Sequence, residues 1–448
     1  RRAWEKRESA FIPIYGRRRV GKSELILNFI SNLNNIYFLG KQAPPQLQIK
    51  EFMQQAAKSL DEPLLAQITP TDWKTALETA LSKTGPDTKL VLALDEFQWI
   101  AKASPELPSV LQELWDRKWQ KSGQVMLIIC GSYMGFMEKE ILGSKSPLFG
   151  RRTAQIPLQP FSYREAALFF PGWSLSDCAR AYFICGGVPY YLKAFDKYKS
   201  IASNIQHQIL DQFSPLFREP DFLLREELKE LERYFAVLMA LATNSLSIGN
   251  IAGQTGIPEK NMYYYLQNLI ELQYVKRKYP LTNKKPSSRN VRFEICEPLL
   301  SFWFRFMYPN ISFISQTNPD KAYQTLIEPY LNSYFGYCFE KLCREAMPFV
   351  YSKEGIQTRF EVGEYWDKYV QIDLVGYRQD NRIDIGECKW GEIKSMLKAG
   401  QELRQKIKKY PNPDNETIQP RIFTRTRVKD KQKHDIICHC LEDLYSNS

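Results

Sequence analysis

The sequence lacks any run of 18 apolar residues, which is the length that a membrane-spanning helix needs. We therefore expect no membrane partner. The first ten residues, RRAWEKRESA, are charged and have no apolar centre, so they do not resemble a secretory signal peptide. The nine cysteines show no repeated spacing, and no disulfide framework is visible. These absences together predict a cytoplasmic protein.

The sequence also lacks internal repeats, low-complexity segments and a complete zinc motif. The densest group of zinc ligands comprises His434, Cys438, His439 and Cys440. A closed zinc site needs a second Cys-rich half, and the sequence has none at a suitable spacing. We therefore do not expect a structural zinc ion.

The composition is that of a globular protein with several domains. The chain has 448 residues, of which 44% are hydrophobic and 25% charged. The net charge of +11 and the isoelectric point near 9.0 favour a polyanionic partner, with a generally basic surface as the alternative.

The first 160 residues alternate between apolar strands and amphipathic helices. Continuous apolar runs of this kind are typical of central strands in a parallel sheet covered on both faces. We predict an α/β fold with a parallel sheet. The expected strands are 11–15, 36–40, 90–94 and 124–132, and the expected helices include 23–30 and 108–119.

One loop carries a phosphate-binding motif between a buried strand and a helix. Gly16-Arg17-Arg18-Arg19-Val20-Gly21-Lys22-Ser23 fits G-x-x-x-x-G-K-[ST]. Backbone N–H groups and the helix N-terminus form an anion cradle. We expect Lys22 to reach the β and γ phosphates of ATP and Ser23 to bind Mg²⁺. The three arginines could face the phosphates, DNA or a neighbouring subunit of a homo-oligomer, and the sequence leaves this open.

Polar residues at the ends of two later strands complete the expected ATP site. Asp95 would hold Mg²⁺ through water, facing the phosphate loop from a neighbouring strand, and Glu96 would polarise the attacking water. Ser132 could sense the γ-phosphate, although an ordinary turn serine is the alternative. Arg151 and Arg152 are candidates for an arginine finger delivered in cis or in trans, or else a basic loop.

Residues 232–295 predict a winged helix. Helices are expected at 232–242, at 247–256 with Gly256 at its end, and at 257–275, where Pro258 lies near the N-terminus. A basic hairpin with a solvated tip would follow and contact DNA phosphates. The expected DNA contacts are Lys276, Arg277, Lys278, Lys284, Lys285, Arg289 and Arg292. The alternative is a protein-contact winged helix, because the third helix carries few positive charges.

The last strands carry acids that suit a metal site. Asp373 and Glu387 lie at strand-turn-strand spacing, and Lys389 shares a face with Glu387. Glu340, on an earlier helix, could add a further ligand. This pattern predicts metal-assisted phosphodiester hydrolysis, and solvated strand charges are the alternative.

Five segments together resemble the archaeal-type ATPase family of archaea and bacteria. They are GRRRVGKS, LVLALDEFQ, SPLFGRR, GGVPYYL and EPLLSFWFRFMYP. The resemblance implies a P-loop ATPase of the AAA+/STAND kind joined to a winged helix and a domain similar to the PD-(D/E)xK nucleases, which matches Asp373, Glu387 and Lys389. The family's Gly-Arg-Glu segment is absent, so adenine recognition is not assigned, and no proline precedes Asp373.

The expected domains are a P-loop ATPase core at 1–160, a helical lid at 161–228, a winged helix at 229–310 and a restriction-endonuclease-like α/β domain at 311–448. The leading hypothesis is a DNA-associated ATPase with Mg²⁺-dependent endonuclease activity. The rival is a nucleotide-gated signalling switch whose tail is inert and whose winged helix binds protein. DNA stimulation of the ATPase rate would distinguish them.

Overall fold

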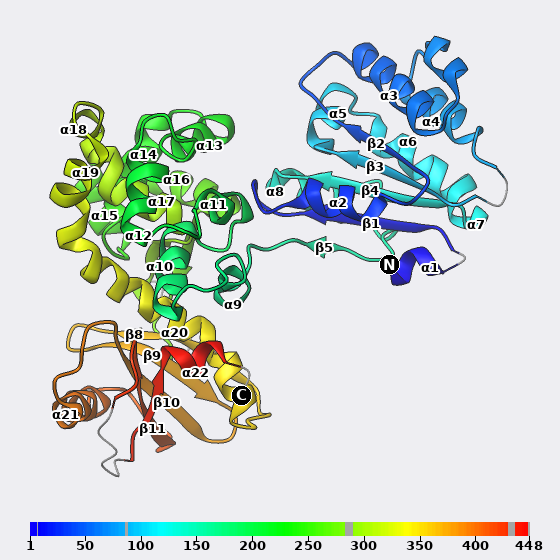
Figure 1. Ribbon diagram of the computed structural model, residues 1–448. Helices are drawn as coiled ribbons and strands as arrows, with labels where there is room; N and C mark the ends of the chain where they lie inside the picture. Colours follow the sequence, from blue (N-terminus) through cyan, green and yellow to red (C-terminus); the bar gives the residue numbers. More distant parts are fainter. Residues whose placement is uncertain (7, 86–87, 283–289, 429–434, 447–448) are drawn as a thin grey trace. The chain divides into compact units, whose positions relative to one another are not determined.

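The computed structural model describes residues 1–6, 8–85, 88–282, 290–428 and 435–446. The chain forms two compact units, residues 1–160 and residues 161–448, which we describe separately (Figure 1). Across the described ranges, no helix combines the length and the apolar character that a bilayer crossing would require.

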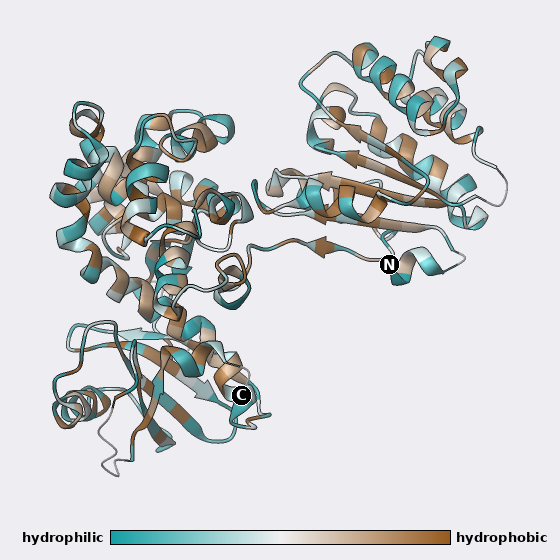
Figure 2. Ribbon diagram, in the orientation of Figure 1, coloured by the Kyte–Doolittle hydropathy of each residue, from teal (hydrophilic) through white to brown (hydrophobic). Residues whose placement is uncertain are grey.

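The first unit is built on a five-stranded parallel sheet in the order β2-β3-β4-β1-β5. Its central strands are buried along their whole length and appear as continuous hydrophobic ribbons (Figure 2). The sequence predicts that the strand ending in Asp95 adjoins the strand before the phosphate loop. In the structure, β4 lies between these two strands. The strands are β1 (Ala10–Tyr15), β2 (Asn35–Leu39), β3 (Leu90–Asp95), β4 (Val125–Gly131) and β5 (Ile156–Pro157).

Helices cover both faces of this sheet and enclose two apolar clusters. The larger cluster is rich in aromatic rings, and Phe38, Phe52 and Trp73 meet edge to face. The helices are α1 (Arg2–Glu5), α2 (Lys22–Ile30), α3 (Pro45–Ser59), α4 (Trp73–Leu81), α5 (Phe97–Ala103), α6 (Leu107–Leu114), α7 (Gln120–Ser122) and α8 (Met134–Phe136).

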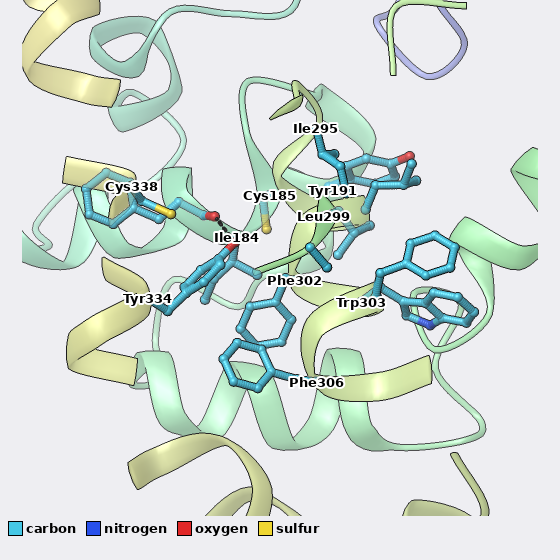
Figure 3. Packing of buried hydrophobic residues seen from close by; sticks show 14 of the residues in the cluster. Ile184, Cys185, Tyr191, Ile295, Leu299, Phe302, Trp303, Phe306, Tyr334 and Cys338 are labelled. Carbon is cyan, nitrogen blue, oxygen red and sulfur yellow. Dashed lines mark hydrogen bonds between the residues drawn. The ribbon is translucent and has the colours of Figure 1, made fainter. Parts of the chain in front are cut away.

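The second unit begins with helices that share one large aromatic core. Figure 3 shows part of it, where Phe302, Phe306 and Tyr334 pack together. The buried Tyr334 hydroxyl is satisfied by donating to the carbonyl of Phe183 at 3.0 Å. The helices are α9 (Tyr163–Ala167), α10 (Leu175–Cys185), α11 (Pro189–Ala194), α12 (Ile201–Asn204), α13 (Glu219–Glu227), α17 (Pro298–Phe302), α18 (Ile311–Ser315) and α19 (Pro319–Ala322).

Three helices and a hairpin occur where the sequence places them. The helices are α14 (Leu231–Leu241), α15 (Ile248–Thr255) and α16 (Glu259–Glu271), and the antiparallel strands are β6 (Val275–Lys278) and β7 (Arg292–Ile295). Gly256 ends α15 with a φ of 72°, which favours glycine. Leu246 pairs with Phe293 and so ties the α14–α15 connection to the hairpin.

The last part of the chain forms a mixed sheet in the order β12-β11-β10-β9-β8. Strands β8, β9 and β10 are antiparallel neighbours, whereas β10, β11 and β12 run parallel. Strand β12 and helix α22 were not expected from the sequence. The elements are α20 (Leu331–Lys353), β8 (Phe360–Trp366), β9 (Gln371–Arg378), β10 (Arg382–Lys389), α21 (Met396–Ile407), β11 (Thr417–Thr424), β12 (Ile437–Cys440) and α22 (Leu441–Tyr445).

The segment that leaves β6 joins the edge of this mixed sheet. Pro280 pairs with Glu364 of β8, and the Leu281 N–H donates to the Glu364 carbonyl at 2.8 Å. The Leu281 side chain enters the core of the mixed sheet, and the Tyr410 hydroxyl donates to its carbonyl at 3.1 Å. Residues 279–282 are therefore docked and not part of a free hairpin arm. The expected solvated tip falls on residues 283–289, outside the described ranges.

Candidate functional site

The phosphate loop follows β1 and takes the backbone path that its glycines allow. A Cβ on Gly16 would lie 2.2 Å from the carbonyl oxygen of Leu158, so a side chain there would collide with backbone. Gly21 precedes α2 with a φ of 91°, a conformation that other residues rarely adopt. Val20 is buried, which anchors the loop between these glycines.

Lys22 lies folded over the loop that it is predicted to serve. Its ammonium group donates to the carbonyl oxygens of Gly16 at 2.8 Å and Arg17 at 2.9 Å. Only 6% of the residue is exposed, and burial lowers the pKa of Lys22 below its usual value. An anion in the loop would offer this buried charge a better partner than neutral carbonyls.

Asp95 is fully buried at the end of β3 and faces the start of α2 across the intervening β4. Ser23 Oγ and the Tyr37 hydroxyl each donate to its Oδ2 at 2.6 Å, and the Glu96 N–H donates to Oδ1 at 2.8 Å. Ser23 and Asp95, predicted to share Mg²⁺, are thus already at hydrogen-bond distance. A hydroxyl and a carboxylate are hard oxygen donors of the kind that Mg²⁺ prefers, so the residues fit the ion.

Glu96 and Ser132 are hydrogen-bonded to each other and to Gln98, a residue that the sequence did not single out. Ser132 Oγ donates to Glu96 Oε2 at 2.8 Å. The Gln98 amide nitrogen donates to the same Glu96 oxygen and, at 3.2 Å, to Ser132 Oγ. Glu96 sits just outside α5 with a φ of 48° and a ψ of 43°.

The arginines of the first unit have different surroundings. Arg17 is 8% exposed, whereas Arg19 is exposed and holds a φ of 67°. The Arg151 guanidinium binds both carboxylate oxygens of Asp116 at 2.7–2.8 Å, so in this structure it serves a structural ion pair. Arg152 is exposed, with its Nη1 3.4 Å from the Leu142 carbonyl, and of the two it is the better placed to meet a partner.

The cations at the base of the hairpin are mostly engaged by the protein itself. Lys278 is 8% exposed and pairs with Glu294 at 3.4 Å and with Glu364. The Arg292 guanidinium lies 4.8 Å over the Trp366 ring, and burial lowers the pKa of Arg292. Both cations are thus engaged by groups of the protein itself, and their contact with DNA stays a prediction.

Among the described residues of the hairpin, Lys276 and Arg277 are accessible. Arg277 is exposed and donates to the Gln267 side chain at 2.9 Å, and the half-exposed Lys276 lies 3.5 Å from Glu294. Burial raises the energy of the Glu294 charge, but the surrounding cations, with Lys341 first, hold its pKa well below the usual value. The predicted contacts Lys284, Lys285 and Arg289 lie outside the described residues.

The C-terminal acids lie on adjacent strands but are not arranged as an open metal site. Both oxygens of Glu387 accept hydrogen bonds from lysines, Lys389 at 2.8 Å and Lys406 at 2.6 Å. Asp373 Oδ2 accepts the Cys388 N–H at 3.0 Å. Across the described ranges, no three His, Cys, Asp or Glu side chains are grouped as a metal ion would require. Two lysine ammonium groups therefore occupy the positions beside Glu387 that a cation would take.

Burial and neighbouring negative charge nevertheless raise the pKa of two of these acids. Burial, followed by the charge of Glu387, raises the pKa of Asp373. Burial, followed by the charge of Asp373, raises the pKa of Glu340. Carboxyl groups that share a buried site in this way are relieved by a proton or a cation. Of the histidines considered as zinc ligands, His439 stacks on Phe423, and His434 is outside the described residues.

Three residues of these sites were missed from the sequence, namely Tyr37, Gln98 and Lys406. Tyr37 lies on β2 and Gln98 on α5, outside the phosphate-loop motif, and no sequence spacing marks either residue. Lys406 was visible only as one of several lysines in a charged helix. The helical spacing of α21 with its buried Leu403 could have shown which lysine faces the sheet.

Comparisons with known proteins show which families the chain resembles. Residues 1–195 match the family described as an ATPase domain predominantly from Archaea, and residues 303–403 match a family of archaeal and bacterial proteins of unknown function. An uncharacterized protein of Methanocaldococcus jannaschii is 29% identical over 439 residues, which cover 97% of this chain and 95% of the relative.

Solved structures resemble the chain more distantly. A Walker-type ATPase of Pyrococcus abyssi is 18% identical with a TM-score of 0.48, over 66% of this chain and 91% of that chain. The ORC2 protein of Aeropyrum pernix is 14% identical with a TM-score of 0.43, over 69% and 88%. The parallel sheet confirms the predicted α/β fold of the N-terminal part of the chain, and the matched ATPase-domain family agrees with it.

Proposed function

We propose that this protein binds ATP with Mg²⁺, hydrolyses it, and uses nucleotide binding to govern engagement of DNA. The observation that carries the ATP part is the Ser23–Asp95 hydrogen bond beside a buried Lys22. It brings the predicted metal ligands together with a buried cation whose hydrogen bonds, within the described residues, go to two neutral carbonyls. The ATPase family match over residues 1–195 supports the same assignment.

The chain's own residues suggest how ATP would be held. Lys22 would exchange the carbonyls of Gly16 and Arg17 for phosphate oxygens, while the loop N–H groups bind the phosphates. Ser23 and Asp95 would hold Mg²⁺, which neutralises phosphate charge when bound. Glu96, in hydrogen-bond contact with Ser132, would accept a proton from the attacking water.

The test of the ATP assignment uses two variants and a control. Lys22→Ala should lose ATP binding, and Glu96→Gln should keep binding and lose turnover, because an amide does not accept the proton. Lys41→Ala removes an exposed lysine that pairs with Glu51 at 2.8 Å and should behave as the wild type. Normal hydrolysis by Glu96→Gln would contradict the role given to Glu96.

The DNA assignment rests on α14, α15, α16 and the β6–β7 hairpin, which follow one another in the order of a winged helix. The accessible hairpin cation Arg277 would contact phosphate. Arg277→Glu should weaken duplex binding and reduce the slope of log affinity against log salt by about 1. Arg225→Glu, which changes an exposed arginine on α13, is the control. Anisotropy with a labelled duplex over a salt series measures both.

We further propose that residues 331–445 form a nuclease-like domain. The support is the mixed sheet with Asp373 and Glu387 on neighbouring strands, beside a cavity of about 400 Å³ lined by Lys389, Trp390 and Lys398. Cleavage would require Glu387 to leave Lys406. Lys406→Met should therefore increase Mn²⁺ binding measured by calorimetry, and Glu387→Gln should abolish it. Absence of both metal binding and DNA cleavage in the wild type would mean that the domain is inert.

A second candidate is a nucleotide-gated switch whose winged helix binds protein. It is favoured by the burial of Lys278 and the stacking of Arg292, which leave the hairpin base less basic than its sequence. In addition, Tyr263 and Tyr264 are exposed on α16, where a DNA-reading helix would carry more positive charge. An ATPase rate that does not respond to DNA would favour this candidate.

A further inference from the structure

Gln98 is a buried polar residue with no assigned role. It follows the acids at the end of β3 as the second residue of α5, and 5% of it is exposed. A buried glutamine costs stability unless its amide is hydrogen-bonded, so its partners show what it is there to hold. Both hydrogen bonds that its nitrogen makes go to the ATP site.

The amide nitrogen closes a triangle on one carboxylate oxygen. It donates to Glu96 Oε2 and to Ser132 Oγ, and Ser132 Oγ donates to the same Glu96 oxygen. Across the described residues, no protein group donates to the other oxygen, Glu96 Oε1. One oxygen is thus fixed by two donors, and the other keeps its lone pairs for an incoming proton.

This contact needs the unusual backbone of Glu96. Side chains two apart on a helix point in different directions and do not meet. Glu96 lies just before α5 with a φ of 48° and a ψ of 43°, and this left-handed turn lets its carboxylate reach Gln98. L residues other than glycine rarely adopt this conformation. We attribute its presence at Glu96 to the hydrogen bonds that the carboxylate makes.

The end of β4 is shaped around the same amide. A Cβ on Gly131 would lie 2.9 Å from Gln98 Oε1 and 2.6 Å from the Met137 sulfur. The amide orientation is set by its partner, because the reverse orientation would place Oε1 against the Glu96 carboxylate. Gln98 Oε1 makes no hydrogen bond within the described part of the chain. The Gln98 side-chain nitrogen therefore keeps its hydrogen bond to Glu96, while the Gln98 side-chain oxygen has no hydrogen bond there.

We propose that Gln98 is a positioning residue that, together with Ser132, holds Glu96 by Oε2 and leaves Oε1 to accept the proton of the attacking water. This inference rests on the proposed ATPase function. Gln98 does not touch nucleotide and acts only through Glu96, so its loss affects turnover and leaves ATP binding in place.

The first test replaces Gln98 by methionine, which keeps the length of the side chain and removes the donors. Gln98→Met should lower kcat on the order of 10- to 100-fold, the cost of misplacing a reacting group by about 1 Å. Its affinity for a fluorescent ATP analogue should stay within about twofold of wild type, because the contact is not with nucleotide. The control is Gln48→Met, which removes another buried amide of the same unit and should leave kcat unchanged.

The second variant, Gln98→Glu, tests the donor itself and serves if methionine does not fold. A carboxyl group at this position donates to Glu96 only when protonated. Its kcat relative to wild type should therefore be lowest at alkaline pH and recover as the pH falls, whereas Gln98→Met should show no such recovery. A wild type that does not hydrolyse ATP would overturn the proposed function. An active wild type with Gln98→Met equally fast, or with kcat and ATP affinity falling together, would overturn the positioning role alone.

Discussion

Single residues set the shape of the proposed ATP site through the space that they leave for neighbouring side chains. Gly131 ends β4 where the side chains of Gln98 and Met137 converge, and a Cβ there would be closer to both than real contacts allow. The glycine is required by packing, since its backbone lies in an ordinary strand. A motif description of this segment as strand followed by Gly-Ser gives no sign of that requirement.

We expect Gly131→Ala to act on both stability and turnover. The added methyl group forces Gln98 or Met137 to move, which costs about 1–3 kcal/mol of unfolding free energy. Moving Gln98 also releases Glu96, so kcat should fall while ATP binding persists. Urea unfolding and steady-state hydrolysis measure the two effects. Gly135→Ala is the matched control, because a Cβ there meets nothing within 4 Å. Equal behaviour of the two variants would contradict this account.

At the scale of elements, a charge network joins the hairpin to the C-terminal sheet. Lys278 of β6 pairs with Glu294 of β7 and Glu364 of β8, and Lys341 of α20 pairs with Glu294 at 2.9 Å. Glu294 is 1% exposed and Glu364 is 8% exposed. Buried charges of this kind bind elements together because each one is costly without its partners.

Removing one cation from this network should destabilise the second unit. Lys278→Met keeps an apolar stem of similar length and leaves two buried carboxylates short of a partner. The expected loss is about 3–5 kcal/mol in unfolding free energy. Arg277→Met, one position away and exposed, should change stability by less than about 0.5 kcal/mol. A chemical denaturation series compares them, and a small effect of Lys278→Met would mean that water replaces the lost partner.

A second network lies within the mixed sheet and contains a titratable group. Arg421 of β11 is 1% exposed and pairs with Asp384 at 2.6 Å and with Glu354. Its Nη1 donates to His439 Nε2 at 2.9 Å, which requires a neutral imidazole. Burial, and then the charge of Arg421, lowers the pKa of His439 from 6.5 to about 4.

The lowered pKa predicts how stability depends on pH. Between pH 6.5 and 4 the unfolded chain binds a proton at His439 that the folded chain does not, so this contribution to stability is present above pH 6.5 and is lost as the pH falls toward 4. The loss is at most about 3 kcal/mol. His439→Gln still accepts from Arg421 but does not titrate. Its unfolding free energy should decline less than that of wild type over this range, and parallel curves would contradict the assignment.

At the scale of the molecule, each of the two units has hydrophobic clusters of its own. The clusters of the first unit lie within residues 1–160, and the large aromatic cluster and the sheet cluster lie within residues 161–448. The residues of the proposed ATP site all belong to the first unit. The hairpin and the C-terminal acids belong to the second unit, which also contains the regions that the sequence predicts to be a lid, a winged helix and a nuclease-like domain.

Calorimetry of the full chain should therefore show ATP acting on one unit. A ligand that binds only the folded first unit stabilises it by about 2.7 kcal/mol at a concentration 100 times its Kd. We expect two thermal transitions, of which ATP with Mg²⁺ raises one, and Lys22→Ala should abolish that shift. Lys278→Met should lower the other transition. A single transition moved by both changes would show that the units unfold together.

The sequence by itself determined much of the local structure of residues 1–160. The strands β1 to β4 follow from apolar periodicity, and the loop from Gly16 to Ser23 follows from its spacing, because both are local properties of the chain; the short strand β5 was not predicted. The acids Asp95 and Glu96 could be placed at a strand end for the same reason. Strand order could not be obtained in this way, since it depends on crossovers between distant segments, and β4 lies where the sequence suggested direct pairing.

Only the tertiary structure decided which charged residues are accessible and which are paired. Seven cations between 276 and 292 read as one basic surface, yet Lys278 is buried against acids that lie far along the chain, and Arg292 stacks on Trp366. The sequence likewise predicts Glu387 as a metal ligand, whereas in the structure its carboxylate accepts a hydrogen bond from Lys406. Tyr37 and Gln98 are likewise recognised as part of the proposed ATP site only through their hydrogen bonds to Asp95 and Glu96. Such contacts are set by long-range packing, and no local pattern encodes them.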